Sequence, residues 1–224
     1  MEVWDKRRRL MYEYVDSREL DRYRRDCSNT MTQLRDELNR QYDIVTQFTL
    51  VGSGSHARKL VTRNGNGPFD LDYNLIIVRM PNEYWDNLGL LKETVRRTLN
   101  QIEKNEWFSD GKDSTSVITA LLHFKDTPQI EFSFDIAILA KNESDNFCRL
   151  IHNKRYNQYT WNEVPSSHNV RNKADELKSD GYWGDVRKLY LDKKNMYLRR
   201  GDFNHPSFVV YVETINELYS RIYR

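Results

Sequence analysis

Glycine is rare in this chain and is concentrated in one place. Only nine glycines occur in 224 residues, and four of them are Gly52, Gly54, Gly65 and Gly67. Glycine adopts left-handed backbone angles and allows close approach of the backbone to a ligand at little steric cost. The concentration therefore predicts a loop whose backbone adopts a conformation, or makes an approach, that the rest of the chain does not.

The size and composition indicate a folded protein with one generous domain, or with a core and a small second lobe. Hydrophobic residues make up 38% of the chain, and 14 Tyr, 9 Phe and 5 Trp supply much of the core. Charged residues reach 30%, and the formal net charge is +2. This composition argues against a disordered chain and against a protein whose function rests on overall positive charge.

The sequence shows no pattern of a secreted or membrane protein. Its first residues are charged throughout, and its longest apolar stretches, such as residues 75–78, are only as long as strands. The two cysteines, Cys27 and Cys148, provide neither a disulfide framework nor the spacing of a zinc site. We therefore expect a cytoplasmic protein with no membrane segment.

Hydrophobic periodicity predicts alternating helices and strands in the first two thirds of the chain. Apolar residues recur every three or four positions after Asp16 or Ser17, which predicts a capped helix that continues through Leu38. A second helix is expected from Asn82, as its cap, to Ile102. Strands are predicted where apolar and polar residues alternate, in the segments 47–51, 70–78, 116–124 and 129–139.

Beyond residue 165 the pattern is helical to the end of the sequence. One helix is predicted over about residues 183–197 and another over 204–222, with Phe208 among the residues that the second one buries. This order of elements predicts an α+β fold with a mixed sheet flanked by helices and with a C-terminal helical lobe. We expect the core and its N-terminal helices over residues 1–160 and the lobe over residues 161–224.

A phosphate-binding loop is predicted at the first pair of glycines. Residues 50–58 read Leu-Val-Gly-Ser-Gly-Ser-His-Ala-Arg, and glycines before a helix start allow several N–H groups to approach one anion. A serine hydroxyl adds a donor for a phosphate oxygen, and both Ser53 and Ser55 fit that role. His56 lies in the same loop, where the sequence is equally compatible with substrate contact and with a bystander role.

Two carboxylates follow on the next predicted strand. Asp70 and Asp72 are two residues apart, so their side chains share one face of the strand. Like charges at this distance repel each other, and a bound divalent cation relieves the repulsion. Asp135 joins them if its strand lies beside theirs, although a shift in register would place Glu131 there instead. Three such carboxylates hold two Mg²⁺ ions about 4 Å apart in two-metal enzymes.

The order of these motifs resembles the polymerase-β nucleotidyltransferase superfamily. Residues 54–58, Gly-Ser-His-Ala-Arg, are similar to the Gly-Ser-x-Ala-Arg start of its small bacterial members, and residues 52–75 resemble the corresponding segment of cyclic-GMP-AMP synthase-like enzymes. The motif-bearing resemblance covers about residues 48–139. It implies a polymerase-β-like core and the metal-dependent transfer of a nucleoside monophosphate from a nucleoside triphosphate to an acceptor hydroxyl, with release of pyrophosphate.

The resemblance also implies roles for single residues. Ser55 and the backbone of Gly54 would hold the β- and γ-phosphates. Two ions, Mg²⁺ or Mn²⁺, would be bound by the catalytic carboxylates Asp70, Asp72 and Asp135. The last of these would also help to deprotonate the acceptor hydroxyl.

Further nucleotide contacts are implied in the C-terminal lobe. In the synthase-like relatives, a lysine of this lobe contacts the triphosphate, and a serine before an aromatic residue helps to seat the nucleotide. The expected lysine is Lys193, with Lys188 and Lys194 as alternatives, and the expected serine is Ser207, before Phe208. Considered alone, each of these residues is more typical of a solvent-exposed helix face or of a row of core residues than of a binding site.

The sequence departs from its relatives in one segment of the core, and it leaves the acceptor undetermined. The spacing between Ser55 and Asp70 predicts an inserted loop over residues 63–68. The acceptor is a second nucleotide, an RNA end, a small molecule or a protein, and the sequence does not choose among them. The competing hypothesis is a non-catalytic module on the same fold that binds nucleotide or RNA, or an antitoxin-like protein that binds a partner.

Overall fold

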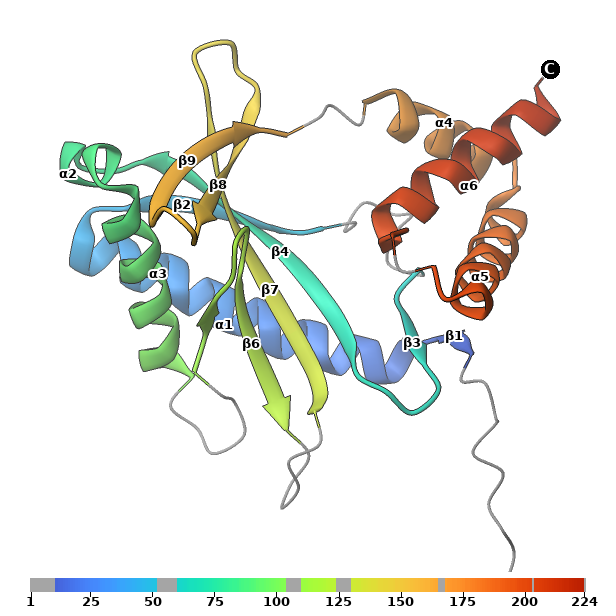
Figure 1. The fold of residues 1–224 in the computed structure, drawn as a ribbon, viewed down its shortest axis with the longest axis horizontal. Helices are drawn as coiled ribbons and strands as arrows, with labels where there is room; N and C mark the ends of the chain where they lie inside the picture. The colour runs from blue at the N-terminus through green and yellow to red at the C-terminus, as the bar shows by residue number, and fades with distance from the viewer. Residues whose placement is uncertain are drawn as a thin grey trace, which may run out of the picture. The chain divides into compact units, whose positions relative to one another are not determined.

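The computed structural model describes residues 11–51, 60–103, 110–123, 130–164, 168–202 and 204–223 (Figure 1). The helices are α1 (Ser17–Tyr42), α2 (Asn82–Asp86), α3 (Leu88–Ile102), α4 (His168–Ser179), α5 (Trp183–Arg200) and α6 (Ser207–Ile222). The strands are β1 (Tyr12–Tyr14), β2 (Val45–Leu50), β3 (Thr62–Asn64), β4 (Phe69–Arg79), β5 (Lys112–Asp113), β6 (Ile118–His123), β7 (Ile130–Lys141), β8 (Phe147–Asn153) and β9 (Gln158–Glu163). The predicted α+β class is therefore confirmed. Among these described helices, none combines the length and the apolar character that a bilayer crossing requires.

The described residues form two compact units. The sheet unit holds α1, the large sheet, α2 and α3, over residues 16–51 and 68–164. The helical unit gathers α4, α5 and α6 together with two segments from the first half of the chain, 11–15 and 60–67. The expected division of the sequence near residue 160 stays a prediction, and the helical unit includes β1 and β3 from before that boundary.

The sheet unit is built on a seven-stranded mixed sheet. The strand order is β2-β4-β7-β6-β5, and β8 pairs with both β7 and β9. Strands β4 and β7 are parallel, whereas the other neighbouring pairs are antiparallel. Strands β6 and β8 both pair with the same edge of β7. Strand β6 pairs with its first part and β8 with its last residues. The two central strands thus run side by side with matched side-chain rows.

Alternation of side chains gives the first halves of β4 and β7 one apolar face and one polar face. Every second residue from Phe69 to Leu75 of β4 is buried, and so is every second residue from Phe132 to Ile136 of β7. Helix α1 covers these rings, because Tyr23 stacks on Phe132 with 4.8 Å between ring centres. The residues between them, including the acids of both strands, point to the opposite face.

Helix α1 begins as the sequence predicts, but the next helix does not. The carboxylate of Asp16 accepts hydrogen bonds from the first N–H groups of α1. The single helix expected over residues 82–102, with Asn82 as its cap, is instead two helices. Asn87 accepts from the Leu90 N–H at 3.0 Å and caps α3. Its backbone leaves helical angles to do so, which ends α2.

Residues 63–68 are not the inserted loop that the spacing predicted. They begin inside β3, which pairs with β1, and then form the tight turn into β4. Gly65 has a positive φ of 56°, and a Cβ on Gly67 would lie 2.9 Å from the carbonyl oxygen of Asn64. Two of the four clustered glycines, Gly65 and Gly67, therefore lie in this turn, where any other residue would cause backbone strain or a steric clash.

Two apolar clusters and a side-chain contact to the backbone of β1 hold the described helical unit together. One cluster joins α4, α5 and α6 through Ala174, Leu177, Val186, Ile215 and Leu218, and the other contains Leu60, Tyr190 and Val210. Asn195 of α5 binds both backbone groups of Tyr12, accepting from its N–H at 2.7 Å and donating to its carbonyl at 3.1 Å. The prediction that Phe208 is buried was wrong. Its side chain is 58% exposed, because α6 begins at Ser207 and turns Val210 inward instead.

Candidate active site

Three aspartates lie on the polar face of the sheet, in two adjacent parallel strands. Asp70 and Asp72 project from β4, and β7 places Asp135 directly opposite Asp72. Ser133 lies opposite Asp70 in the same register. The register therefore makes Asp135, and not Glu131, the neighbour of Asp72.

Hydrogen bonds engage these carboxylates unequally. The Ser133 hydroxyl donates to Asp70, and the hydroxyl of Thr119, which is the partner of Asp135 on β6, donates to Asp135. The Oδ1 atom of Asp135 is buried and has no hydrogen-bond partner among the described residues. A buried carboxylate oxygen in this state is normally satisfied by a water, an ion or a ligand.

Partial burial, with repulsion within the group as the second cause, raises the pKa of two of the three aspartates. Partial desolvation, together with the charges of Asp135 and Asp70, raises the pKa of the solvent-accessible Asp72 to about 6, while Arg149 opposes the rise. Desolvation also raises the pKa of Asp135, with a smaller contribution from Asp70 and an opposing hydrogen bond from Thr119. Carboxylates in such a group gain stability when a cation binds.

The side chains of the three aspartates do not converge on one point. In the parts of the chain that the structure describes, no three His, Cys, Asp or Glu side chains form a group able to hold a metal ion. The strand register thus places the three aspartates of the expected metal cluster as neighbours, but their side chains are not arranged around one point. Ser133 binds Asp70, and the like charges repel one another. The donors still fit a divalent cation, since carboxylate oxygens are preferred ligands of Mg²⁺ and one buried oxygen of Asp135 has no partner in the described part of the chain.

The predicted phosphate loop begins beside these aspartates. Strand β2 pairs with β4, and the Val51 N–H donates to the Asp72 carbonyl at 2.7 Å. The chain therefore leaves the sheet next to Asp72. The loop candidates themselves lie outside the described residues, and they are Ser53, Gly54, Ser55 and His56.

In the helical unit, Lys194 rather than Lys193 contacts Ser207. The Nζ atom of Lys194 donates to the Ser207 hydroxyl at 2.9 Å, and the Lys194 residue is only 9% exposed. Lys193 instead forms ion pairs with Glu217 at 2.8 Å and with Glu213 at 3.7 Å. Of the two expected contacts in this region, the structure thus brings Ser207 together with Lys194, which was an alternative in the sequence, while a role for Lys193 stays a prediction.

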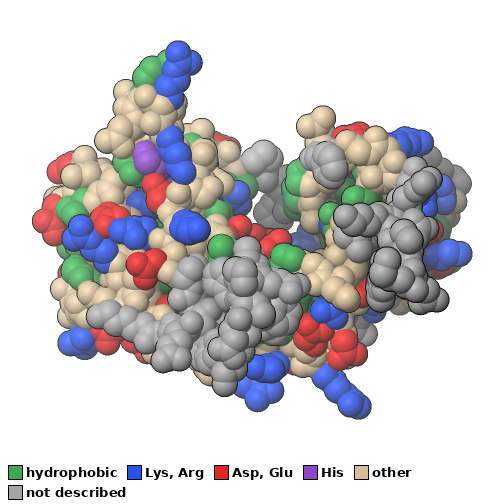
Figure 2. Space-filling model, turned by 60° about the horizontal axis from the view of Figure 1, so that its bottom comes forward, with side chains coloured by type: hydrophobic (Ala, Val, Ile, Leu, Met, Phe, Trp, Pro, Cys, Tyr) green, Lys and Arg blue, Asp and Glu red, His purple; other side chains and the backbone are tan. Residues whose placement is uncertain are grey.

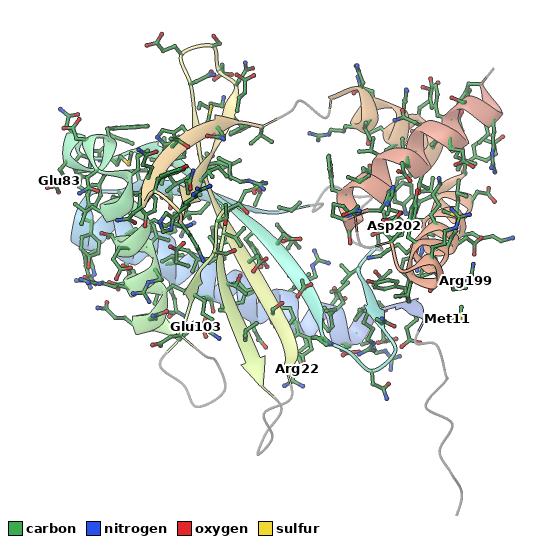
Figure 3. The ribbon with its side chains drawn as sticks, in the orientation of Figure 1. Met11, Arg22, Glu83, Glu103, Arg199 and Asp202 are labelled. Carbon is green, nitrogen blue, oxygen red and sulfur yellow. The ribbon has the colours of Figure 1, made fainter. Side chains whose placement is uncertain are left out.

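Lys194 and Ser207 line a pocket of about 180 Å³ within the helical unit. The ammonium group of Lys194 lies 4.1 Å from the centre of the Tyr12 ring, a cation–π contact that supports a charge away from water. His205 and Asp202, the latter labelled in Figure 3, also line the pocket. The sequence gave no signal for Tyr12 or His205, because their place in this pocket depends on how the elements pack.

The charge distribution is mixed on the face shown in Figure 2, where Lys and Arg side chains are interspersed with Asp and Glu. The basic residues of α1 follow the same pattern. Arg24, for example, lies 3.5 Å from Asp21. The described residues on the face in Figure 2 therefore present no continuous basic surface of the kind that binds long nucleic acids.

Several solved structures share this fold. CdnC of Escherichia coli MS115-1, solved with ATP, aligns with a TM-score of 0.55 and 17% identity over 92% of this chain and 62% of that chain. An Escherichia coli DncV bound to 3′-deoxy GTP aligns with a TM-score of 0.60 and 13% identity over 96% of this chain and 70% of that chain. The GTP-bound DncV of Vibrio cholerae gives 0.52 and 14% over 86% and 48%, and that protein is described as a cyclic AMP-GMP synthase.

No protein-family model matches the sequence, and no curated protein does. The chain spans 62% of the CdnC chain and 48% of the Vibrio cholerae DncV chain, so it corresponds to only part of those proteins. At identities this low, the likeness establishes the fold alone. The chain has the polymerase-β-like nucleotidyltransferase fold of CdnC and DncV, as the order of its motifs predicted.

Proposed function

We propose that this protein is a metal-dependent nucleotidyltransferase. It transfers a nucleoside monophosphate from a nucleoside triphosphate to an acceptor hydroxyl and releases pyrophosphate. The observation that carries the proposal is the parallel register of β4 and β7, which sets Asp135 opposite Asp72 and beside Asp70 on one polar face. The fold shared with the nucleotide-bound CdnC and DncV structures supports the same class of reaction.

Asp70, Asp72 and Asp135 are the proposed ligands of two Mg²⁺ or Mn²⁺ ions. When bound, such ions neutralise charge on the phosphates and favour the ionised form of the attacking hydroxyl. Two features of the aspartates fit this role. The buried Oδ1 of Asp135 has no partner among the described residues, and partial burial together with the neighbouring charges of Asp135 and Asp70 raises the pKa of Asp72.

Asp135 is also the proposed acceptor of the proton from the attacking hydroxyl. Thr119 donates to its carboxylate and so restrains its orientation, and a raised pKa makes it a stronger base than an ordinary aspartate. The hydroxyl oxygen then forms a bond to the α-phosphorus as the bond from that phosphorus to the bridging oxygen breaks. Pyrophosphate leaves with the electron pair, on the side opposite the attacking oxygen.

Phosphate binding is proposed for two further sets of residues. The first is Gly54 with Ser53 or Ser55, on the resemblance of their loop. The second is Lys194 with Ser207, because a buried lysine bonded to a serine hydroxyl offers two donors to a phosphate oxygen.

Replacing Lys194 with Met is expected to weaken ATP binding roughly tenfold or more, because a charged donor to phosphate is lost. Calorimetric titration of ATP in the presence of Mg²⁺ measures the effect. The adjacent Lys193→Met is the matched control, since Lys193 already has Glu217 as its partner. Equal loss in both variants would remove Lys194 from the nucleotide site.

Product analysis tests the proposed function directly. The protein is incubated with the four ribonucleoside triphosphates and Mg²⁺ or Mn²⁺, and products are identified by mass spectrometry. The wild type is expected to form pyrophosphate and new nucleotide-linked products, which would identify nucleotides as acceptors. The Asp70→Asn/Asp72→Asn variant should form roughly a hundredfold less or lower still, while it unfolds cooperatively at a temperature no lower than that of the wild type, because it removes mutually repelling carboxylates. If the folded variant instead keeps the full biological function of the wild-type protein, that function does not require catalysis, and the protein is a non-catalytic binding module.

A further inference from the structure

We propose that Arg149 and Asn74 form an oxoanion-binding subsite at one end of the aspartate face, for a phosphate group of the substrate. The proposal rests on the nucleotidyl transfer inferred above, because it assumes that a phosphorylated substrate reaches this face. It assigns a role to β8, whose residues carried none of the predicted motifs.

The strand register places Arg149 on the polar face. Its partner on β7 is Leu139, and the partner of Leu139 on β4 is Ile76. Paired residues of neighbouring strands point to the same side of a sheet, and residues two apart on one strand do as well. Arg149 therefore shares a face with Asn74 and Asp72, which precede Ile76 on β4.

A small residue leaves room for the Arg149 side chain to reach back along this face. The row between those of Asp72 and Arg149 contains Asn74 on β4 and Ala137 on β7, and Ala137 carries only a methyl group. The charge of Arg149 acts on the Asp72 carboxylate and opposes the rise of its pKa. Arg149 and the aspartates thus lie on one face of the sheet, two rows apart.

Both members of the subsite bury a polar atom without a partner. Among the described residues, neither Nε of Arg149 nor Oδ1 of Asn74 has a hydrogen-bond partner, and both atoms are buried. An unsatisfied buried donor on a charged group is more costly than one on a neutral group. Phosphate oxygens would accept from the guanidinium, and the Asn74 amide can turn its NH₂ toward the same oxyanion.

The electrostatics of the face favour a phosphate at this end. Three aspartates repel a phosphate, and a guanidinium on the same face offsets that repulsion with a geometry that matches two phosphate oxygens. Within the described part of the chain, Arg149 influences Asp72 but forms no ion pair with any carboxylate. Its buried Nε, which has no partner among the described residues, is therefore a donor that a ligand can satisfy.

Calorimetric titration with three probes tests the subsite: ATP, inorganic tripolyphosphate and inorganic phosphate. Arg149→Met is expected to weaken binding roughly tenfold to a hundredfold, because a charge-assisted hydrogen bond is lost. Arg149→Lys should recover only part of the lost affinity, since lysine keeps the charge but not the fork of donors.

Arg155→Met is the matched control, because Arg155 lies in the β8–β9 turn over the exposed Tyr156 ring. A loss with ATP and tripolyphosphate alone identifies the triphosphate chain, whereas a loss with inorganic phosphate identifies a single phosphate, such as one on the acceptor.

The outcomes separate this proposal from the proposed function. If Arg149→Met binds every probe as the wild type does, the subsite is overturned even where nucleotide transfer is observed. If Arg149→Met loses binding and the wild type forms no transfer product, the subsite stands and the proposed function fails. If the wild type binds no probe, both fail. Should Arg149→Met not fold, Asn74→Asp decides, because it adds a negative charge to the subsite, and unchanged binding in that variant overturns it.

Discussion

Asp135→Asn is expected to lower kcat on the order of a hundredfold to a thousandfold, which is the range for loss of one preorganised catalytic group. Asparagine keeps the volume of Asp135 and can still accept from Thr119, but it neither carries the charge nor takes up the proton. Because the loss concerns the transition state, kcat and kcat/KM should fall together while KM changes little. Steady-state measurement of pyrophosphate release gives both constants.

Asp145→Asn is the control for this substitution. Asp145 lies in the exposed turn after the same strand, where its carboxylate pairs with Lys141 at 2.7 Å. Its backbone has a positive φ of 65°, which asparagine tolerates well. The control should therefore leave both kinetic constants unchanged. Wild-type kcat in a folded Asp135→Asn protein would exclude Asp135 from the chemistry.

Alternation along two strands made most of the aspartate face predictable. A shift of one residue moves every side chain of a strand to the other face, so the buried Phe69 and Leu71 fix the direction of Asp70 and Asp72. Local pattern could not choose between Asp135 and Glu131. That choice depends on the register between β4 and β7, which lie far apart in the sequence.

The hairpin of β8 and β9 was not predicted from the sequence, and neither was the Arg149 subsite on β8. Strand β9 lies at the end of its side of the sheet and pairs only with β8. All six of its residues are exposed or half-buried, so it has no buried apolar row. In β8 buried residues do alternate, but Phe147 and Ile151 place apolar side chains on the other face as well, which blurs the alternation in the sequence.

The choice between Lys193 and Lys194 shows how far helical periodicity reaches. Successive helical residues differ by about 100° around the axis, so only one of the two lysines shares the inner face. Val186, Tyr190 and Lys194 are buried at a spacing of four residues. Extending that row by one turn would have identified Lys194. The contact of Asn195 with Tyr12, in contrast, joins residues 183 positions apart and has no local signal.

A cluster of charged side chains joins α3 to β5 and β8 within the sheet unit. The Nζ atom of Lys92 lies 2.5 Å from one oxygen of Asp113 and donates to the Ser114 carbonyl at 2.6 Å. The other oxygen of Asp113 lies 2.6 Å from Nδ1 of His152, whose ring stacks on Tyr159. Lys92 is only 3% exposed, so its ammonium group depends on these partners.

The pKa values of the pair show the same dependence. Partial burial acts to raise the pKa of Asp113, but hydrogen bonds from Lys92 and His152 hold it below its ordinary value. Burial lowers the pKa of Lys92, against the opposing effect of Asp113. The stability that ionised Asp113 contributes is therefore present above the ordinary aspartate pKa of about 3.9. It is lost as the pH falls through the lower, folded value.

Asp113→Asn is expected to lower the free energy of unfolding at pH 7 by roughly 3 kcal/mol, because it leaves Lys92 buried without its counter-charge. Adding Lys92→Met should restore much of the loss, since the double variant has neither charge to bury. Urea unfolding of the wild type, both single variants and the double variant measures the coupling. The loss in Asp113→Asn should shrink as the pH falls from about 4, the ordinary aspartate pKa, through the lower pKa of Asp113 in the folded wild type. A coupling under about 0.5 kcal/mol would show that the two charges act independently, contrary to the contact between them.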